Sequence, residues 1–170
     1  ISDTLHGGQA FRWDPPYHGS EWHTGVISGN VVKIRQKATG LEFRCSPNSQ
    51  SQMRPVIEDY LRLHDDLNGI LLTFPDDKHM SLAIAKYNGL RILRQDPWEC
   101  LISFICSANN NIARITGLVA RLCETFGSPI DAGNCQYRSF PSPDVLRDVG
   151  EQRLRDLGLG FRAPYVYQTA

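Results

Sequence analysis

The chain lacks several features that would by themselves indicate a function. Lysine plus arginine and aspartate plus glutamate each total 18 among 170 residues, so no basic excess points to nucleic acid. No long apolar run and no signal-like start is present, which predicts a soluble, intracellular protein without membrane contact. The 5 histidines are scattered, without the short pairings of a zinc or haem site. We therefore expect no metal site.

The cysteines are odd in number and contain no CxxC pair. They lie at Cys45, Cys100, Cys106, Cys123 and Cys135. This pattern favours free, buried thiols in a reducing compartment over a disulfide framework. Of the 18 cationic residues, 14 are arginine, whose planar guanidinium suits bidentate contacts to bases and phosphates.

The first 50 residues or so alternate in the manner of β-strands separated by turn residues. The predicted strands are Gln9–Trp13, Trp22–Ile27, Val31–Gln36 and Leu41–Cys45. The pattern predicts a small antiparallel meander. A helical stripe from Met53 to Leu61 is predicted to cover one face of this sheet. A second helix after Pro75 is predicted to turn Met80, Ile84 and Tyr87 inward and to end at Gly89.

From Leu93 onward every periodic segment is helical. Asp96 is a predicted N-cap, followed by Pro97 and by Glu99 at the capping-box position. Further helices are predicted over 112–126, from 143 after the cap Ser142, over 151–157 and over 163–170. We thus expect an α+β unit over 1–92 and a helical unit over 93–170. The chain has no initiating methionine and its last helix runs to Ala170, so we expect a part of a longer protein.

Three consecutive asparagines, Asn109, Asn110 and Asn111, separate two apolar helical stripes and are followed by Arg114. Asparagine ends and caps helices well, so one or two of the three can have a purely structural role. Three together leave spare amide groups beside a cation, a combination that suits base edges and phosphates.

The segment Leu157–Arg162 places an aromatic residue and an arginine on a glycine-rich loop. One interpretation is a helix end at which Phe161 folds back into the core. The other is a wedge, in which the ring fills the gap left by an extruded nucleotide and Arg162 offers donors to the unpaired base.

Taken together, three long segments resemble the 8-oxoguanine DNA glycosylases of the helix-hairpin-helix superfamily. They are GQAFRW (Gly8 to Trp13), GLRILRQDPWECLISFICSANNNIARITG (Gly89 to Gly117) and LGLGFRAPYV (Leu157 to Val166), in the family's order and approximate spacing. The resemblance spans nearly the whole chain and corresponds to the first half of the family. It implies a TATA-binding-protein-like antiparallel sheet unit followed by the start of an all-α glycosylase domain.

The resemblance also implies roles for matched positions. The carbonyl of Gly8 would accept a hydrogen bond from N7–H of the oxidised purine, whereas normal guanine presents a lone pair there. By residue type alone, Gly8 could simply turn the chain into a strand. Asn109 would enter the space vacated by the flipped base, and Arg114 and Arg162 would bind the estranged cytosine. Phe161 stands where the family usually has a tyrosine, so the stacking surface is kept and the hydroxyl is lost. We expect the DNA-binding set Asn109, Asn110, Asn111, Arg114, Phe161 and Arg162.

The catalytic groups that the resemblance implies, a lysine nucleophile and an aspartate, are expected beyond Ala170. Lys33, Lys37, Lys78 and Lys86 match no catalytic position. The family uses no metal or organic cofactor, and its partner is damaged double-stranded DNA. We expect a monomer located with the DNA, in the nucleus or the nucleoid. Two alternatives remain: a DNA-binding or lesion-sensing module that has lost the lysine, and a related glycosylase for another oxidised or alkylated base.

Overall fold

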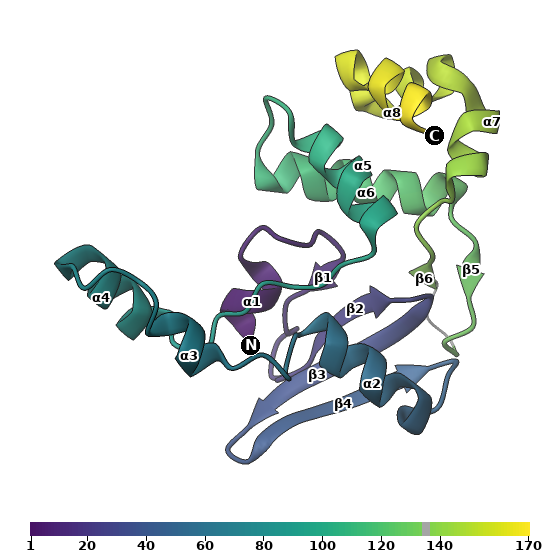
Figure 1. Ribbon diagram of the computed structural model, residues 1–170. Helices are drawn as coiled ribbons and strands as arrows, with labels where there is room; N and C mark the ends of the chain where they lie inside the picture. Colours follow the sequence, from purple (N-terminus) through teal and green to yellow (C-terminus); the bar gives the residue numbers. More distant parts are fainter. Residues whose placement is uncertain (134–136) are drawn as a thin grey trace.

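The computed structural model describes residues 1–133 and 137–170, so the predicted thiol of Cys135 lies outside the described residues. A sheet unit lies beside a helical unit, and an arm of two short helices projects from the sheet unit (Figure 1). The elements of the sheet unit and the arm are α1 (Ser2–His6), β1 (Trp13–Asp14), β2 (His23–Ile27), β3 (Asn30–Lys37), β4 (Gly40–Ser46), α2 (Gln50–Tyr60), α3 (Leu67–Leu71) and α4 (Lys78–Lys86). The remaining elements are α5 (Pro97–Ser107), α6 (Ile112–Phe126), β5 (Pro129–Ile130), β6 (Tyr137–Arg138), α7 (Pro143–Leu154), η1 (Arg155–Leu159), η2 (Gly160–Arg162) and α8 (Ala163–Thr169).

The sheet is the predicted antiparallel meander, with the strand order β1-β2-β3-β4. Its register places Val32 opposite Gly25 on one side and Cys45 on the other. The predicted first strand is wrong over Gln9–Arg12, because only Trp13 and Asp14 pair with β2. The preceding residues are held by hydrogen bonds between Gln9 and the segment 91–95, made by the side chains of Gln9 and Gln95, instead of a strand ladder.

Helix α2 covers one face of the sheet, as its apolar stripe predicts. Met53 and Ile57 are buried in the same cluster as Val32 and Ile34 of β3. Ser49 and Gln52 form a complete capping box at its start. The apolar stripe therefore determines which face of the helix packs on the sheet.

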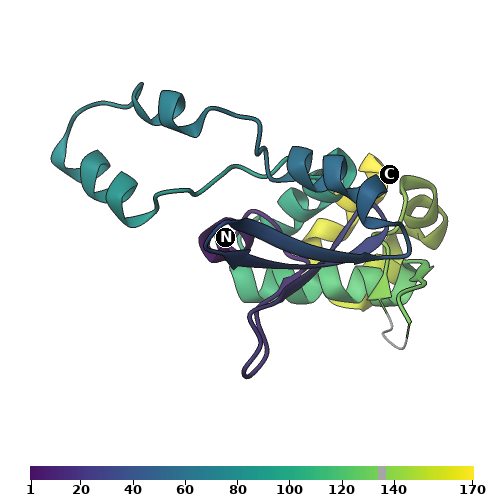
Figure 2. The ribbon, with the colours of Figure 1, turned by 90° about the horizontal axis from the view of Figure 1, so that it is seen from below.

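The arm comprises α3 and α4 and stands away from the body of the molecule in both views (Figures 1 and 2). The sequence predicts the existence of the second helix correctly, but the helix ends at Lys86 and not at Gly89, and its predicted burial is wrong. Met80 and Ile84 are only partly buried and Tyr87 is 44% exposed. No residue from 62 to 92 is buried, so the inward-facing stripe has no body of protein to pack against here.

The helical unit has its own core between α5, α6, α7, η1 and α8. Its fully buried members include Ile102, Leu122, Leu146, Leu154, Leu159 and Val166. The predicted start of α5 is confirmed, because the carboxylate of Asp96 accepts from the backbone N–H of Glu99 at 2.9 Å. The predicted capping box is incomplete, however, since the carboxylate of Glu99 is engaged elsewhere.

Glu99 pairs with Arg12 of the sheet unit at 3.1 Å, and both side chains are largely buried. Arg12 also donates to the main-chain carbonyl of Arg138. Burial raises the pKa of the Glu99 carboxyl, and the guanidinium of Arg12 opposes that shift. The side chain of Glu99 thus connects the helical unit to the sheet unit and does not complete the capping box.

The segment after α6 differs from the prediction in two places. The predicted helix over 151–157 is divided between the end of α7 and the π-helical turn η1, and Gly150 interrupts helical geometry with a φ of 79°. The short hairpin of β5 and β6 was not predicted, because strands of two residues leave no periodic pattern.

The four described cysteines are free. Cys106 and Cys123 are buried, and burial raises the pKa of each thiol to about 11. Cys45 is half-buried, and the prediction of burial is wrong for Cys100, which is exposed. Among the described residues, no helix is both long and apolar enough to cross a membrane.

Candidate nucleic-acid interface

The turn between α5 and α6 assigns different tasks to the three asparagines. The side chain of Asn110 donates to the carbonyl of Cys106 at 3.0 Å and thereby ends α5. The side chain of Asn111 accepts from the N–H of Arg114 at 3.0 Å and caps α6. Asn109 is exposed and adopts a φ of 48°, which asparagine tolerates better than most residues. Within the described chain, only Asn109 of the three has a side chain without a hydrogen-bond partner.

Arg114 lies one turn into α6 and is exposed. Its guanidinium makes no hydrogen bond or ion pair with any described residue, so all five of its N–H donors remain available to a ligand. At this helix junction, the side chains of Asn109 and Arg114 present free N–H donors, and the side-chain amide oxygen of Asn109 is a free acceptor.

Arg162 lies beneath this turn and is only 5% exposed. Its Nε donates to the carbonyl of Ala108 at 2.9 Å, and its Nη2 donates to the carbonyl of Asn109 at 3.0 Å. These carbonyls close α5, where a cation also interacts favourably with the helix dipole. Sequence reasoning places Arg162 on the DNA, whereas the structure directs its guanidinium to the backbone of the turn.

The guanidinium of Arg162 also lies over the ring of Phe161, with its carbon 4.3 Å from the ring centroid. The ring is 53% exposed, so it does not fold back into the core. Gly158 and Gly160 on the same loop have φ values of 100° and 59°, conformations that favour glycine. One buried arginine therefore connects the asparagine turn to an exposed aromatic ring.

Gly8 lies beside the first residue of α6. It has a φ of 81°, and a Cβ atom placed on it would be 3.1 Å from Cδ1 of Ile112. The structure thus brings Gly8 next to the helix that begins at the asparagine triplet, although about 100 residues separate them in sequence.

Gln9 was missed by sequence reasoning as a positioning residue for this glycine. Its Oε1 accepts from the N–H of Leu93 at 3.0 Å, and its Nε2 donates to the carbonyl of Arg91 at 3.0 Å. Its own carbonyl accepts from Nε2 of Gln95 at 2.7 Å. The sequence feature that could have indicated this role is a glutamine among mainly apolar residues, because a buried side-chain amide needs hydrogen-bond partners.

A second anchor precedes Gly8. Nε2 of His6 in α1 and Nδ1 of His23 in β2 lie 2.8 Å apart. Burial lowers the pKa of both imidazoles. The hydrogen bond between the two rings therefore needs at least one neutral imidazole as acceptor.

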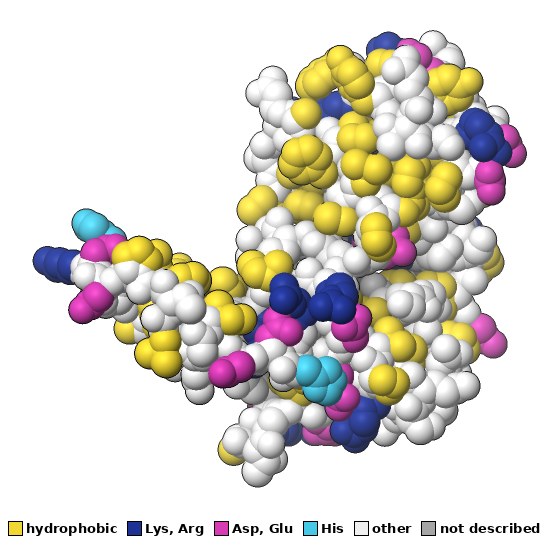
Figure 3. Space-filling view, in the orientation of Figure 1, with side chains coloured by type: hydrophobic (Ala, Val, Ile, Leu, Met, Phe, Trp, Pro, Cys, Tyr) yellow, Lys and Arg dark blue, Asp and Glu magenta, His cyan; other side chains and the backbone are white. Residues whose placement is uncertain are grey.

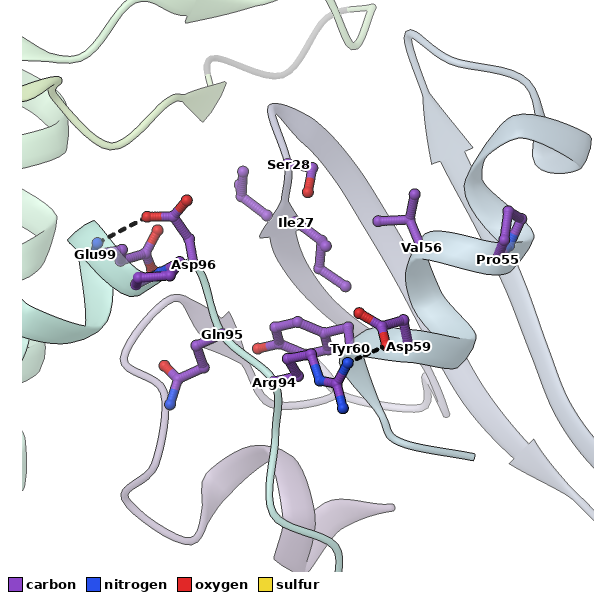
Figure 4. Close-up of a pocket in the computed structure, with 12 residues that line it drawn as sticks. Ile27, Ser28, Pro55, Val56, Asp59, Tyr60, Arg94, Gln95, Asp96 and Glu99 are labelled. Carbon is purple, nitrogen blue, oxygen red and sulfur yellow. Dashed lines mark hydrogen bonds and ion pairs between the residues drawn. The ribbon is translucent and has the colours of Figure 1, made fainter. Parts of the chain in front are cut away.

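A hollow of about 560 Å³ between α2 and the start of α5 contains none of the predicted site residues. Figure 4 shows Asp59, Asp96 and Glu99 around it, with Arg94 paired to Asp59 at 2.9 Å. Its one lining arginine, Arg94, is already paired with Asp59, so the hollow offers no free cation to a phosphate. The candidate interface is therefore sought at Asn109, Arg114 and Phe161, which lie outside this hollow.

Two protein families match the chain in tandem. The family described as 8-oxoguanine DNA glycosylase, N-terminal domain, matches residues 1–101. The family described as HhH-GPD superfamily base excision DNA repair protein matches residues 102–170.

Individual relatives are consistent with these matches. An N-glycosylase/DNA lyase of Saccharomyces cerevisiae is 37% identical over 100% of this chain and 48% of the yeast protein. The N-glycosylase/DNA lyase OGG1 of Arabidopsis thaliana is 34% identical over 98% of this chain and 46% of the plant protein. The chain therefore spans about half the length of the relatives that it matches.

A crystal structure of the Clostridium acetobutylicum 8-oxoguanine glycosylase/lyase, in complex with double-stranded DNA containing cytosine opposite 8-oxoguanine, has the same fold. The TM-score is 0.88 at 28% identity, over 99% of this chain and 57% of the bacterial protein.

Proposed function

Because the chain belongs to the 8-oxoguanine DNA glycosylase family, we propose that the full-length protein acts in base-excision repair. It removes 8-oxoguanine opposite cytosine from double-stranded DNA and cleaves the abasic strand by β-elimination. The base is flipped out of the helix before it is removed. The protein acts as a monomer in the compartment that holds the DNA.

The observation that carries this proposal is that the buried Arg162 contacts both the main-chain carbonyl of Asn109 and the ring of Phe161, while Arg114 follows Asn109 at the start of α6. The exposed ring of Phe161 supplies a surface that can enter a base step, and the amide of Asn109 can fill the vacated space. Arg114 supplies free donors for the O2 and N3 acceptors of the estranged cytosine. Asn110 and Asn111 contribute by shaping the turn, and Arg162 adds its remaining donor if the DNA reaches it.

Gly8 supplies the proposed selectivity for the oxidised base. Its carbonyl accepts from N7–H of 8-oxoguanine and meets a lone pair in guanine, a difference of about 1–3 kcal/mol. The side chain of Gln9 holds the backbone of this segment through its bonds to Leu93 and Arg91. A fixed carbonyl discriminates better than a mobile one, because it cannot turn away from guanine.

The chemistry belongs to the part of the protein that the chain does not span. The chain's lysines lie on β3, at Lys33 and Lys37, and on α4, at Lys78 and Lys86. Neither element carries a residue of the proposed interface. We infer that a lysine in the remaining half displaces the base and forms the Schiff base, assisted by an aspartate. We also propose that residues 1–92 and 93–170 are the two structural units that this chain contributes.

Binding of the 170-residue chain to a duplex with an abasic-site analogue opposite cytosine tests the interface. Replacing Arg114 by Ala should weaken binding by about 1–3 kcal/mol and reduce discrimination between cytosine and other bases opposite the lesion. Arg54→Ala is the matched control, because Arg54 is an exposed arginine of α2. Equal effects of the two substitutions would contradict the assignment.

Borohydride trapping of the Schiff base distinguishes a glycosylase from a lesion sensor that has no catalytic activity. The full-length protein should give a covalent adduct with DNA containing 8-oxoguanine, whereas the 170-residue chain should give none. A full-length protein that binds the lesion through Arg114 but traps no adduct would support the sensor.

A further inference from the structure

The arm of α3 and α4 exposes an apolar surface that this chain leaves uncovered. Leu72 is 86% exposed, Leu82 is 60% exposed and Ile92 is 63% exposed. Neither helix has a buried residue, and they contain only 5 and 9 residues. Helices this short are marginal in water without tertiary packing. The two helices of the arm therefore need a partner surface to stabilise them.

The inner side of the arm is a groove of about 360 Å³. Its apolar lining includes Leu67, Leu71, Phe74, Met80, Ile84 and Tyr87. The tip carries Asp76, Asp77, Lys78 and His79, all exposed. Figure 3 shows charged side chains at this end of the arm and apolar ones along its length. The tip is therefore suited to water, whereas the apolar groove is suited to a protein surface.

A second uncovered apolar surface belongs to α5. Phe104 is 74% exposed and Leu101 is 43% exposed, and both line a hollow that also contains Leu93 and Pro97. Apolar side chains gather both on the arm and over the helical unit on the face seen in Figure 3. The arm and the helical unit are set apart in both ribbon views (Figures 1 and 2).

The base of the arm is fixed, so its direction is defined. Nη1 of Arg91 donates to the carbonyls of Arg62 and Asp65 at 2.5 and 3.3 Å. The N–H of Arg91 donates to Oγ1 of Thr4 at 3.3 Å. These bonds join the two ends of the arm to each other and to the sheet unit.

We propose that the arm groove and the exposed face of α5 are the two sides of a docking surface for the remaining half of the full-length protein. The bacterial glycosylase matches 99% of this chain, arm included, yet this match accounts for only 57% of its own length. An arm shared with a longer protein is more simply covered by that protein's additional residues than by a second copy. The proposal rests on the proposed function, because the same remaining half would carry the catalytic lysine.

The test compares urea unfolding of the full-length protein with that of the 170-residue chain. Ile92, which is exposed and lines the arm groove, and Phe104 on α5 are the residues to change. Ile92→Asp and Phe104→Asp should lower the urea midpoint of the full-length protein, because each would bury a carboxylate. Both should leave the midpoint of the 170-residue chain unchanged, because the side chains are exposed there. Tyr17→Asp is the control, an 81% exposed aromatic residue between β1 and β2 that should change neither midpoint.

Three results would overturn the proposal: an unchanged full-length midpoint, equal shifts in both chains, or a dimer of the 170-residue chain that the two substitutions dissociate. The dimer would identify a second copy as the occupant. Because the readout is stability, a shifted midpoint in a full-length protein without glycosylase activity would support docking and contradict only the proposed function.

Discussion

Nη2 of Arg162 donates to the main-chain carbonyl of Asn109 at 3.0 Å, across 53 residues of sequence. This contact joins the two segments that carry the proposed DNA contacts. Asn109 has a left-handed backbone conformation, and a buried guanidinium that binds its carbonyl and that of Ala108 holds it in place. The arginine therefore fixes the position of Asn109.

Replacing Arg162 by Met removes these donors and leaves the carbonyls of Ala108 and Asn109 without partners. We expect a loss of about 1–3 kcal/mol in the free energy of unfolding and weaker binding to the abasic duplex. Amide NMR shifts of Asn109–Asn111 should change even without DNA. Arg155→Met, at an exposed arginine paired with Glu151, should cost less than about 1 kcal/mol. Unchanged asparagine shifts in the Arg162 variant would exclude the positioning role.

Gly8→Ala tests the backbone strain at residue 8 and its close approach to the side chain of Ile112. The substitution places an L-residue at a φ of 81° and a Cβ 3.1 Å from the Ile112 side chain. Gly29→Ala introduces comparable strain at a φ of 70° with no atom within 4 Å. We expect each to cost about 1–2 kcal/mol from backbone strain, with a further loss only at Gly8. In the full-length protein, only Gly8→Ala should reduce discrimination between 8-oxoguanine and guanine.

Acidification should destabilise the protein through His6 and His23. Burial is the main cause that lowers both pKa values below 6.5, so the unfolded chain binds protons more readily than the folded one. This contribution to stability is present above pH 6.5 and is lost as the pH falls through the lowered values. Urea midpoints measured from about pH 8 to about pH 5 should fall less steeply in His6→Gln. His79→Gln, at the exposed tip of the arm, should retain the wild-type slope.

Arg12→Met should raise the pKa of Glu99 further, because burial already raises it and the guanidinium of Arg12 opposes the rise. A carboxyl with a raised folded pKa contributes stability below its unfolded value of 4.5, and that contribution is lost as the pH rises through the folded value. As the pH rises from about 4 to about 7, the free energy of unfolding should therefore fall more in the variant than in the wild type. The additional loss in the variant should be on the order of 3–5 kcal/mol.

The control for this prediction is Arg94→Met. Arg94 pairs with Asp59 at the surface, where both side chains are more than half exposed. Its loss should cost no more than about 1 kcal/mol. A similar pH dependence in the two variants would show that Glu99 is not the titrating group.

Local sequence patterns determined most of the secondary structure. The apolar stripe of α2, the N-cap Asp96 and the cap Ser142 each correctly marked a helix, because these signals act within a few residues. Asn109 and Phe161 also stand out as candidate site residues by their type and position, whereas the role of Gly8 follows only from the family resemblance. What these patterns could not specify was which polar group each side chain would bind.

The tertiary structure decided those partners. It turned Glu99 from its capping position to Arg12, placed Arg162 beneath the asparagine turn, and anchored Gln9 to the segment 91–95. Each contact joins residues more than 50 positions apart, so no local pattern encodes it. The exposure of the arm was likewise decided by the tertiary structure, because the apolar period of α4 shows which face is apolar but not whether anything packs against it.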